Sequence, residues 1–280
     1  MKPATIRTVA ALRNEVGKWG AAGLRTGMVP TMGALHAGHL SLIEAAGQTC
    51  DRVIVTLFVN PTQFAPTEDF SAYPRDEEAD RQELSALDVD LLFAPSTAEM
   101  YPAGYDTKVV VGGPSAGLES EFRPHFFAGV ATVVTKLLVA ALPERAFFGE
   151  KDFQQLLVVK KLVRDLNLPT EIVGCPTMRE PDGLAMSSRN AYFGERERAA
   201  APQLYGTLLE IAERVRADDN LAEALASGHD RLSAAGFAVD YLELRNAETL
   251  EPVTDRASEP LRVLGAGKLG KTRLIDNVAV

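Results

Sequence analysis

Short apolar runs alternate with amphipathic segments over residues 27–176 of the chain. The runs lie at 27–30, 53–60, 90–95, 145–149 and 171–176, and the second of them reads VIVTLFVN. Continuous apolar runs of this length are typical of strands that are buried on both faces of a parallel sheet. The alternation therefore favours folds in which helices cover both faces of one sheet.

Helical patterns fill the intervals between these strands. The clearest spans 126–142, where apolar residues recur at the spacing of one helix face, and others cover 40–48 and 155–166. Strands that alternate with helices imply crossover connections, so we predict an α/β fold with a Rossmann-like, doubly wound parallel sheet. Sheets of this kind bind ligands at the carboxyl ends of their strands.

The pattern changes after residue 176. Polar, Ala-rich helices are expected at 195–217 and 220–235, and strand-like runs follow at 238–244, 261–265 and 272–278. These elements predict a smaller α+β unit. We therefore expect two domains, one over residues 1–175 and one over residues 176–280.

Charge and composition narrow the possible partners and the compartment. The chain has 29 Lys and Arg against 38 Asp and Glu, a net charge of −9, which argues against a broad surface for nucleic acid or anionic lipid. Neither a signal peptide nor a membrane span is recognisable. The two cysteines, Cys50 and Cys175, are too few for a disulfide framework or a cysteine-based zinc site. We expect a cytoplasmic protein.

The stretch PTMGALHAGHLS (30–41) places two of the four histidines three residues apart. It follows a short strand, carries Gly33 and Gly38, and leads into a helix that we expect to start near His39. Free backbone N–H groups and the helix dipole at such a turn favour a phosphate. His36 and His39 would lie on one face of the first turn and donate hydrogen bonds to charge that develops on phosphoryl oxygens.

Two other interpretations of the histidine pair stay open at this point. The pair could bind a metal ion, although HAGH holds no carboxylate between the histidines and no third ligand lies nearby. The pair could also be an incidental polar feature of a helix start. The decision depends on segments elsewhere in the chain.

Three such segments follow predicted strands. FVNPTQFAP (58–66) places Asn60 and Gln63 at the same sheet edge, and an amide that both donates and accepts suits a hydroxy acid. FFGEKDFQQL (147–156) supplies Lys151 for phosphate and Asp152 for ribose hydroxyls. DGLAMSSRN (182–190) combines two hydroxyls with a guanidinium, which together can close over a triphosphate. Taken alone, each could be an ordinary polar loop or helix cap.

Together with YPR (73–75), YLELR (241–245) and TRLIDNVAV (272–280), these motifs closely resemble the pantoate-β-alanine ligase family, the pantothenate synthetases. The resemblance spans nearly the whole chain. HAGH resembles the HxGH signature of the wider nucleotidyltransferase superfamily, and MSSR resembles its mobile KMSKS-type element. HxGH alone would indicate only the superfamily, whereas FGEKDFQQL with DGLAMSSRN indicates the ligase.

The resemblance implies a two-step reaction. ATP and pantoate give pantoyl adenylate and pyrophosphate, and β-alanine then gives pantothenate and AMP. The larger domain would bind ATP and pantoate, and the smaller one would carry the MSSR loop. The resemblance also implies a homodimer and Mg²⁺ that is held mainly by ATP, with few protein ligands.

The resemblance also assigns residues to ligands. His39 would be the proton donor, with His36 and Lys151 as further catalytic groups, and Gln63 and Gln155 would hold pantoate. Gln63 would also lie near β-alanine. The ATP site would comprise Met32, Gly33, Ala34, Leu35, His36, Ala37, Gly38, His39, Gly149, Glu150, Lys151, Asp152, Met178, Met186, Ser187, Ser188 and Arg189.

The chain departs from the family pattern in two places. Relatives usually read RPGHF where this chain reads RPHFF (123–127), so His125 lies one place early and Phe126 takes the usual histidine position. After YPR, relatives can present two aspartates for magnesium, whereas here Ala79 precedes Asp80. Asp80 and Glu83 are the remaining candidate metal ligands.

Two alternatives to the ligase stay open on sequence alone. One is a nucleotidyltransferase that stops at a stable adenylylated or cytidylylated product. The other is a nucleotide-binding regulator that performs no chemistry. Formation of AMP that depends on both pantoate and β-alanine would separate the ligase from both.

Overall fold

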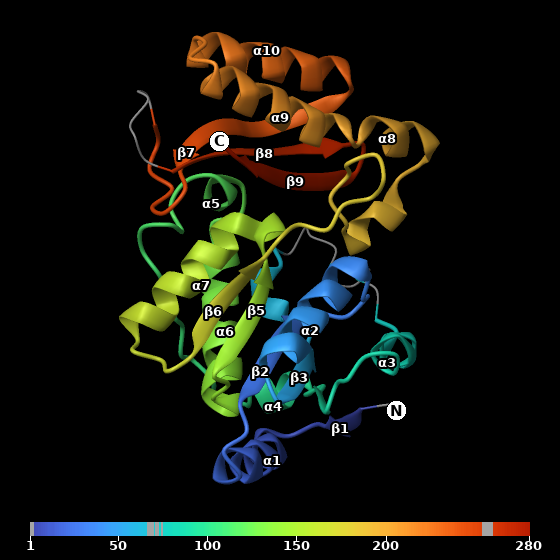
Figure 1. Ribbon diagram of the computed structural model, residues 1–280, viewed down its shortest axis with the longest axis vertical. Coiled ribbons are helices and arrows are strands. Elements are labelled where there is room, and N and C mark those ends of the chain that lie inside the picture. Colours follow the sequence, from blue (N-terminus) through green and yellow to red (C-terminus); the bar gives the residue numbers. More distant parts are fainter. Residues whose placement is uncertain (1–2, 66–69, 71–72, 74, 254–259) are drawn as a thin grey trace. The chain divides into compact units, whose positions relative to one another are not determined.

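The computed structural model describes residues 3–65, 70, 73, 75–253 and 260–280. Pro66 of the FVNPTQFAP segment and Pro74 of YPR lie outside these residues. The chain forms two compact units: the first comprises Met1–Glu150 with Val158–Pro176, and the second comprises Lys151–Leu157 with Thr177–Val280. Figure 1 shows the elements of both units.

In its described part, the first unit is built on a six-stranded sheet in the order β1-β4-β3-β2-β5-β6, in which all paired strands are parallel (Figure 1). The strands are β1 (Ala4–Ile6), β2 (Thr26–Thr31), β3 (Arg52–Leu57), β4 (Leu91–Phe93), β5 (Arg145–Gly149) and β6 (Glu171–Cys175). The central strands β2 and β3 are buried along nearly their whole length, as their apolar sequences predict. The predicted α/β fold class is confirmed.

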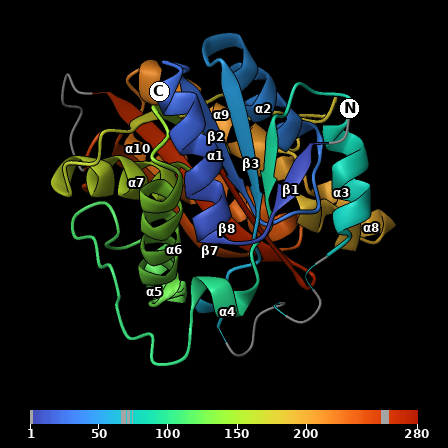
Figure 2. The ribbon, with the colours of Figure 1, turned by 90° about the horizontal axis from the view of Figure 1, so that it is seen from below.

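Helices cover both faces of this sheet. The helical elements of the first unit are α1 (Val9–Ala21), α2 (Ala37–Thr49), η1 (Pro61–Gln63), α3 (Glu77–Leu84), α4 (Thr97–Met100), α5 (Glu119–Phe122) and α6 (Phe126–Ala141). A buried cluster joins Ile43 and Ala46 of α2 and Leu84 of α3 to strand residues such as Val55. The connections through α1 and α6 step along the sheet in the opposite direction, so right-handed crossovers put them on the other face. There they pack against each other (Figure 2).

The second unit, in the residues described, has a three-stranded antiparallel sheet in the order β7-β8-β9. Its strands are β7 (Phe237–Asn246), β8 (Leu261–Leu269) and β9 (Thr272–Ala279). Its helices are α8 (Glu195–Ala200), α9 (Gln203–Arg216) and α10 (Leu221–Ala234), with η3 (Ser188–Tyr192) before them. Leu208 and Ile211 of α9, Leu232 of α10 and Val263 of β8 form its apolar core.

One segment of the chain belongs to both units. The short helix η2 (Glu150–Asp152) follows β5, and α7 (Phe153–Asp165) begins in the second unit and ends in the first. Lys151–Leu157 is grouped with the second unit. The predicted assignment of each ligand to one domain stays a prediction. None of the helices within the described ranges is long and apolar enough to cross a membrane.

Three local predictions need correction. The helix expected near His39 starts at Ala37, because the His36 side chain caps it. The single helix expected over 195–217 is divided into α8 and α9, since Pro202 has no N–H to continue the hydrogen-bond ladder. The strand β1 and the helix α1 were missed: β1 has three residues, and Leu12 is the only buried residue of α1 in the described chain.

The contact between α6 and η1 depends on a glycine. A Cβ atom on Gly129 of α6 would lie 2.5 Å from the carbonyl oxygen of Thr62 and 2.8 Å from Cα of Gln63. These are backbone atoms, so one of the two elements would have to move. The carbonyl of Gly129 also accepts a hydrogen bond of 3.1 Å from the side-chain amide of Asn60.

We predict that Gly129→Ala lowers the free energy of unfolding by about 1–3 kcal/mol, because the extra methyl group overpacks this contact. Urea unfolding measures the change. Gly17→Ala is the matched control, since Gly17 lies on an exposed face of α1 with nothing within 4 Å of the added Cβ. The control should gain about 0.5–1 kcal/mol. A neutral Gly129→Ala would contradict the close contact.

Candidate active site

The turn between β2 and α2 presents the two predicted imidazoles together. The strand ends at Thr31, Gly33 and Ala34 have φ values of +87° and +52°, and His36 is the N-cap of α2. The ring centroids of His36 and His39 lie 4.1 Å apart with 40° between the ring planes. The predicted placement of both rings on one face of the first helical turn is thus observed.

The cap of α2 also determines which tautomer the neutral ring of His36 adopts. Its Nδ1 accepts a hydrogen bond of 3.1 Å from the N–H of Gly38. An imidazole nitrogen that accepts a hydrogen bond carries no proton, so in the neutral ring the proton lies on Nε2. In the neutral ring, Nε2 of His36 is therefore a hydrogen-bond donor.

Asp80 of α3 holds the preceding part of the turn. Its two carboxylate oxygens accept the N–H groups of Leu35 at 2.8 Å and of Ala34 at 3.1 Å. The residue is 5% exposed, and burial raises the pKa of its carboxyl group although both N–H groups act in the opposite direction. Successive N–H groups in a left-handed turn form a concave anion site, and here the chain's own carboxylate fills it.

This arrangement contradicts one step of the sequence argument. Free backbone N–H groups of the turn were expected to point at a phosphate, but Ala34 and Leu35 donate to Asp80, Gly38 donates to His36, and Gly33 donates to the hydroxyl of Thr31 at 3.3 Å. The amides serve to fix the loop.

The segment after β3 lies at the same sheet edge, because Thr31 pairs with Leu57 in the parallel register. Asn60 is 1% exposed, and its amide group is fully used: it donates to the side chain of Gln63 and to the carbonyl of Gly129, and it accepts from Thr62 and from the hydroxyl of Tyr101 at 2.8 Å. Asn60 therefore positions Gln63, in place of the ligand contact expected from the sequence.

Gln63 is joined to a second predicted site residue. Its side-chain N–H donates to the thioether sulfur of Met32, 2.9 Å away, and its carbonyl oxygen accepts from Asn60. A thioether is a weak acceptor, so the amide can exchange this contact for a stronger one. Arg123, which the sequence argument did not single out, donates to the backbone carbonyl of Gln63 at 3.3 Å.

In the second unit, a short hairpin carries the predicted triphosphate loop. Arg179 and Ala185 form an antiparallel bridge, and the N–H of Met186 donates to the carbonyl of Met178 at 2.9 Å. The hydroxyl of Ser187 caps η3 by accepting the N–H of Arg189. Met178 and the Met186–Arg189 loop, both predicted in the ATP site, therefore lie on one small structure.

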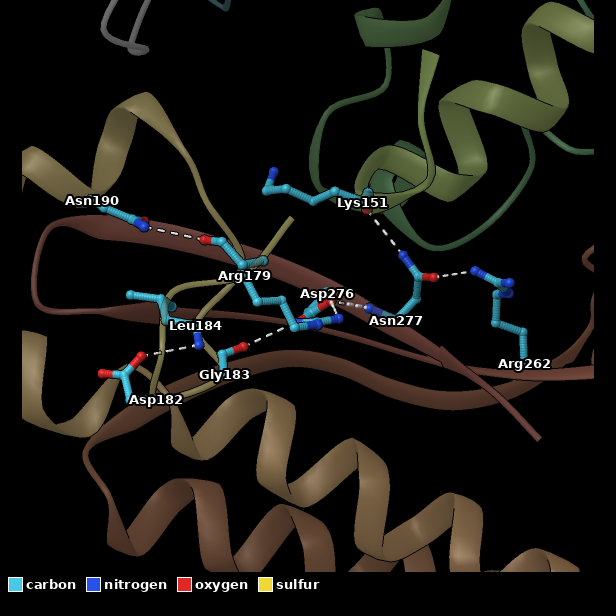
Figure 3. Close-up of polar contacts among 10 residues, drawn as sticks. Lys151, Arg179, Asp182, Gly183, Leu184, Asn190, Arg262, Asp276 and Asn277 are labelled. Atoms are coloured by element: carbon cyan, nitrogen blue, oxygen red, sulfur yellow. Dashed lines mark hydrogen bonds and ion pairs between the residues drawn. The ribbon is translucent and has the colours of Figure 1, made fainter. Parts of the chain in front are cut away.

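Figure 3 shows what surrounds this hairpin. Arg179 pairs with Asp276 of β9, and the neighbouring Asn277 donates to the backbone carbonyl of Lys151. The ammonium group of Lys151 lies 3.5 Å from the carboxylate of its neighbour Asp152. Lys151 and Asp152 could be predicted as site residues from the local sequence, whereas the contact from Asn277 to Lys151 could not, because it joins residues 126 apart.

The pattern of the Pantoate-beta-alanine ligase family matches residues 4–279 of the chain. The chain is 52% identical to pantothenate synthetase from Rhodopseudomonas palustris strain BisA53, over 99% of each chain, and 54% identical to that from Rhodospirillum rubrum, over 98% of each. The chain belongs to the pantoate-β-alanine ligase family.

Solved structures of pantoate-β-alanine ligases have the same fold. The enzyme from Thermus thermophilus is 48% identical with a TM-score of 0.91, over 98% of each chain. The ligase from Francisella tularensis, solved with β,γ-ATP and β-alanine, is 34% identical with a TM-score of 0.83, covering 99% of this chain and 97% of its own. The family predicted from the sequence motifs is confirmed, and with it the class of enzyme.

The departure from the ligase pattern at RPHFF has a structural counterpart. Phe126, in the usual histidine position, is buried at the start of α6, and the Arg123 guanidinium lies 3.8 Å from its ring centroid. His125 is exposed and makes no capping hydrogen bond. In this chain the phenyl ring of Phe126, with the Arg123 guanidinium over it, takes the position of that histidine.

Within the described residues, no group of three or more His, Cys, Asp or Glu side chains is placed to hold a metal ion. Both oxygens of Asp80 are occupied by backbone N–H groups, and Glu83 is exposed on α3. Asp80 therefore holds the turn between β2 and α2. Its role as a metal ligand stays a prediction.

We predict that Gly33→Ala destabilises the chain more than Gly23→Ala does. Both glycines have positive φ (+87° and +71°), so both variants carry backbone strain of about 1–2 kcal/mol. An added Cβ on Gly33 would lie 2.8 Å from a carboxylate oxygen of Asp80, whereas Gly23 has nothing within 4 Å. Urea unfolding should show a further loss of about 1 kcal/mol or more for Gly33→Ala. Equal losses would contradict the contact with Asp80.

Proposed function

We propose that the chain condenses (R)-pantoate with β-alanine in an ATP-dependent reaction, through pantoyl adenylate. The observation that carries the proposal is the match of the ligase family over residues 4–279, nearly the whole chain. The paired imidazoles at the carboxyl end of β2 give it a chemical basis, since they lie where doubly wound sheets bind ligands.

In the first step, a carboxylate oxygen of pantoate attacks the α-phosphorus of ATP. The bond from that phosphorus to the bridging oxygen breaks, and pyrophosphate leaves. Negative charge grows on the phosphoryl oxygens. The Nε2–H of His36, the ring of His39 and the ammonium group of Lys151 would stabilise that charge, and His39 would be the proton donor.

In the second step, the amine of β-alanine attacks the acyl carbon of the adenylate. The bond from that carbon to the phosphate oxygen breaks, AMP leaves, and the new amide nitrogen loses a proton. Both nucleophiles come from the substrates, so the protein needs no nucleophilic side chain. Its task is to position the reactants, which can lower a barrier by roughly 7–11 kcal/mol.

The proposed binding residues follow the family resemblance. Gln63 and Gln155 would hold pantoate, with Gln63 also near β-alanine, and Asp152 would hold the ribose. The weak contact from Gln63 to Met32 supports its assignment, because a carboxylate or hydroxyl is a better acceptor than a thioether. The remaining proposed ATP contacts are Met32–His39, Gly149, Glu150, Met178 and Met186–Arg189.

Magnesium would enter with ATP, as part of that substrate. Mg²⁺ usually keeps several waters and binds substrate phosphates together with one or two carboxylates. Asp80 and Glu83 remain the proposed carboxylates.

The assembly and compartment are also proposals. We propose a homodimer on the family resemblance. Light scattering of the purified protein tests it, because a homodimer has a single mass in solution that is twice that of the 30.2 kDa chain. We propose a cytoplasmic protein on the sequence composition. Its two cysteines, Cys50 and Cys175, are both buried and form no disulfide with each other.

The experiment that tests the function is an omission series. The protein is incubated with ATP, magnesium, pantoate and β-alanine, and then with each component left out. AMP and pantothenate should form together only in the complete mixture. Accumulation of a stable adenylylated product in that mixture would support a different nucleotidyltransferase, and no turnover would support a regulator.

We predict that His39→Ala and Lys151→Ala each lower the rate of adenylation about 100-fold to 1,000-fold, because each removes a group that stabilises developing charge. Pyrophosphate release measures the rate. Matched controls are His229→Ala on α10 and Lys160→Ala on α7, both at exposed positions. Near-normal pyrophosphate release from either site variant would refute its assignment.

We predict that Gln155→Ala raises the pantoate KM about 10-fold or more, since a hydrogen bond to a charged group contributes about 1.5–3 kcal/mol. The KM for ATP should stay within about twofold, because the lost contact is to pantoate alone. The control is Gln82→Ala, at an exposed position of α3. A pantoate KM equal to that of the unaltered protein would argue against this role.

A further inference from the structure

Two neighbouring residues of β9 hold two separate segments of the second unit (Figure 3). Asp276 and Asn277 are each 5% exposed. Successive side chains of a strand point to opposite faces of the sheet. The two residues therefore reach in different directions from one rigid piece of backbone.

Asp276 holds the hairpin that precedes the Met186–Arg189 loop. Its carboxylate accepts two hydrogen bonds from the guanidinium of Arg179, at 2.6 and 2.9 Å. The two side chains are 3% and 17% exposed, so the pair is largely removed from water. A buried charge without its partner is strongly unfavourable. The position of Arg179 is thus tied to that of β9.

Arg179 in turn fixes the fold of the hairpin. It donates to the carbonyl of Gly183 at 3.0 Å, and its guanidinium lies 3.5 Å from the ring centroid of Tyr205 on α9. The amide of Asn190 closes the other end by donating to Glu180 and to the carbonyl of Ala185. The loop from Met186 to Arg189 lies between these two fixed ends.

Asn277 holds the other segment. Its side-chain N–H donates to the carbonyl of Lys151 at 3.0 Å. Its side-chain oxygen accepts a hydrogen bond from Arg262 of β8, and that guanidinium lies 3.7 Å from the ring centroid of Phe153. Asn277 and Arg262 therefore contact Lys151 and Phe153, at the start of α7.

We propose that Asp276 and Asn277 are positioning residues for ATP, which set the Met186–Arg189 loop and Lys151 at a fixed distance from each other through one strand. The proposal rests on the proposed function, in which both segments contact the triphosphate. A misplacement of about 1 Å can cost about 100-fold in rate. Because one strand holds both the Met186–Arg189 loop and Lys151, the two cannot easily shift relative to each other.

Two isosteric variants separate the two contacts. Asp276→Asn replaces an accepting oxygen with an N–H group that faces Arg179. Asn277→Asp replaces the N–H that binds the carbonyl of Lys151 with an oxygen, and keeps an acceptor for Arg262. The matched control is Asp240→Asn: Asp240 of β7 pairs with Arg273 of β9 at 2.6 Å, with side chains 13% and 19% exposed.

Hydrogen exchange of the full chain, followed by mass spectrometry, measures how firmly each of the two segments is held. Asp276→Asn should speed exchange of residues 178–190 about 10-fold or more, and Asn277→Asp should do so for residues 151–157. Asp240→Asn should speed neither segment. Loss of protection spread over the whole second unit in all three variants would overturn the proposal.

Binding of a non-hydrolysable ATP analogue measures the effect of these contacts on nucleotide affinity. Its Kd and the KM for ATP should rise about 10-fold in Asp276→Asn and in Asn277→Asp, and stay within about twofold in Asp240→Asn at a comparable loss of Tm. An equal loss of affinity in the control, or unchanged affinity in both test variants, would overturn the proposal. Should Asp276→Asn fail to fold, Arg179→Lys replaces it, with the same expected result and the same contradicting one.

Lys151→Ala separates this proposal from the proposed function. If Lys151→Ala weakens analogue binding while Asp276→Asn and Asn277→Asp do not, the positioning role alone is wrong. If the unaltered protein makes no pantothenate and Lys151→Ala binds the analogue normally, the proposed function fails as well.

Discussion

The parallel pairing of β2 with β3 and β5 determines what the first unit can present to a ligand. The pairing of β2 with β3 runs from Thr26 to Thr31, and the hydroxyl of Thr31 adds a hydrogen bond of 2.7 Å to the carbonyl of Thr56. The two strands therefore end side by side. The histidine turn and the short helix that carries Gln63 leave the sheet at one edge for this reason, and a shift in register would separate them.

At this edge of the sheet, most of the backbone N–H groups of the histidine turn are bound by the chain's own side chains. In many phosphate sites, backbone N–H groups meet the anion. Here the carboxylate of Asp80 accepts two of those N–H groups. The side-chain amide of Asn60 donates to Gln63 and to the carbonyl of Gly129. These hydrogen bonds hold the histidine turn and the short helix that carries Gln63 in place at the sheet edge. A net charge of −9 makes such local placement necessary for an anionic substrate.

The sequence predicted what depends on local pattern. The strands β2, β3, β5 and β6 each contain a short apolar run, and HAGH and MSSR are each four consecutive residues, so these elements could be located from the sequence. Contacts between distant residues could not be predicted in this way. Leu35 and Asp80 are 45 residues apart, and Arg179 and Asp276 are 97 apart. Nothing in the local sequence of Asp80 indicates that its carboxylate fills the turn that was expected to receive a phosphate.

In the proposed first step, a carboxylate oxygen of pantoate bonds to the α-phosphorus of ATP. Pantoate labelled with ¹⁸O in its carboxylate tests this most directly, with the mass of the released AMP as the readout. If the adenylate forms, AMP carries one ¹⁸O atom, because that oxygen stays on phosphorus when the amine displaces it from carbon. Unlabelled AMP, or label in inorganic phosphate together with ADP, would contradict the account.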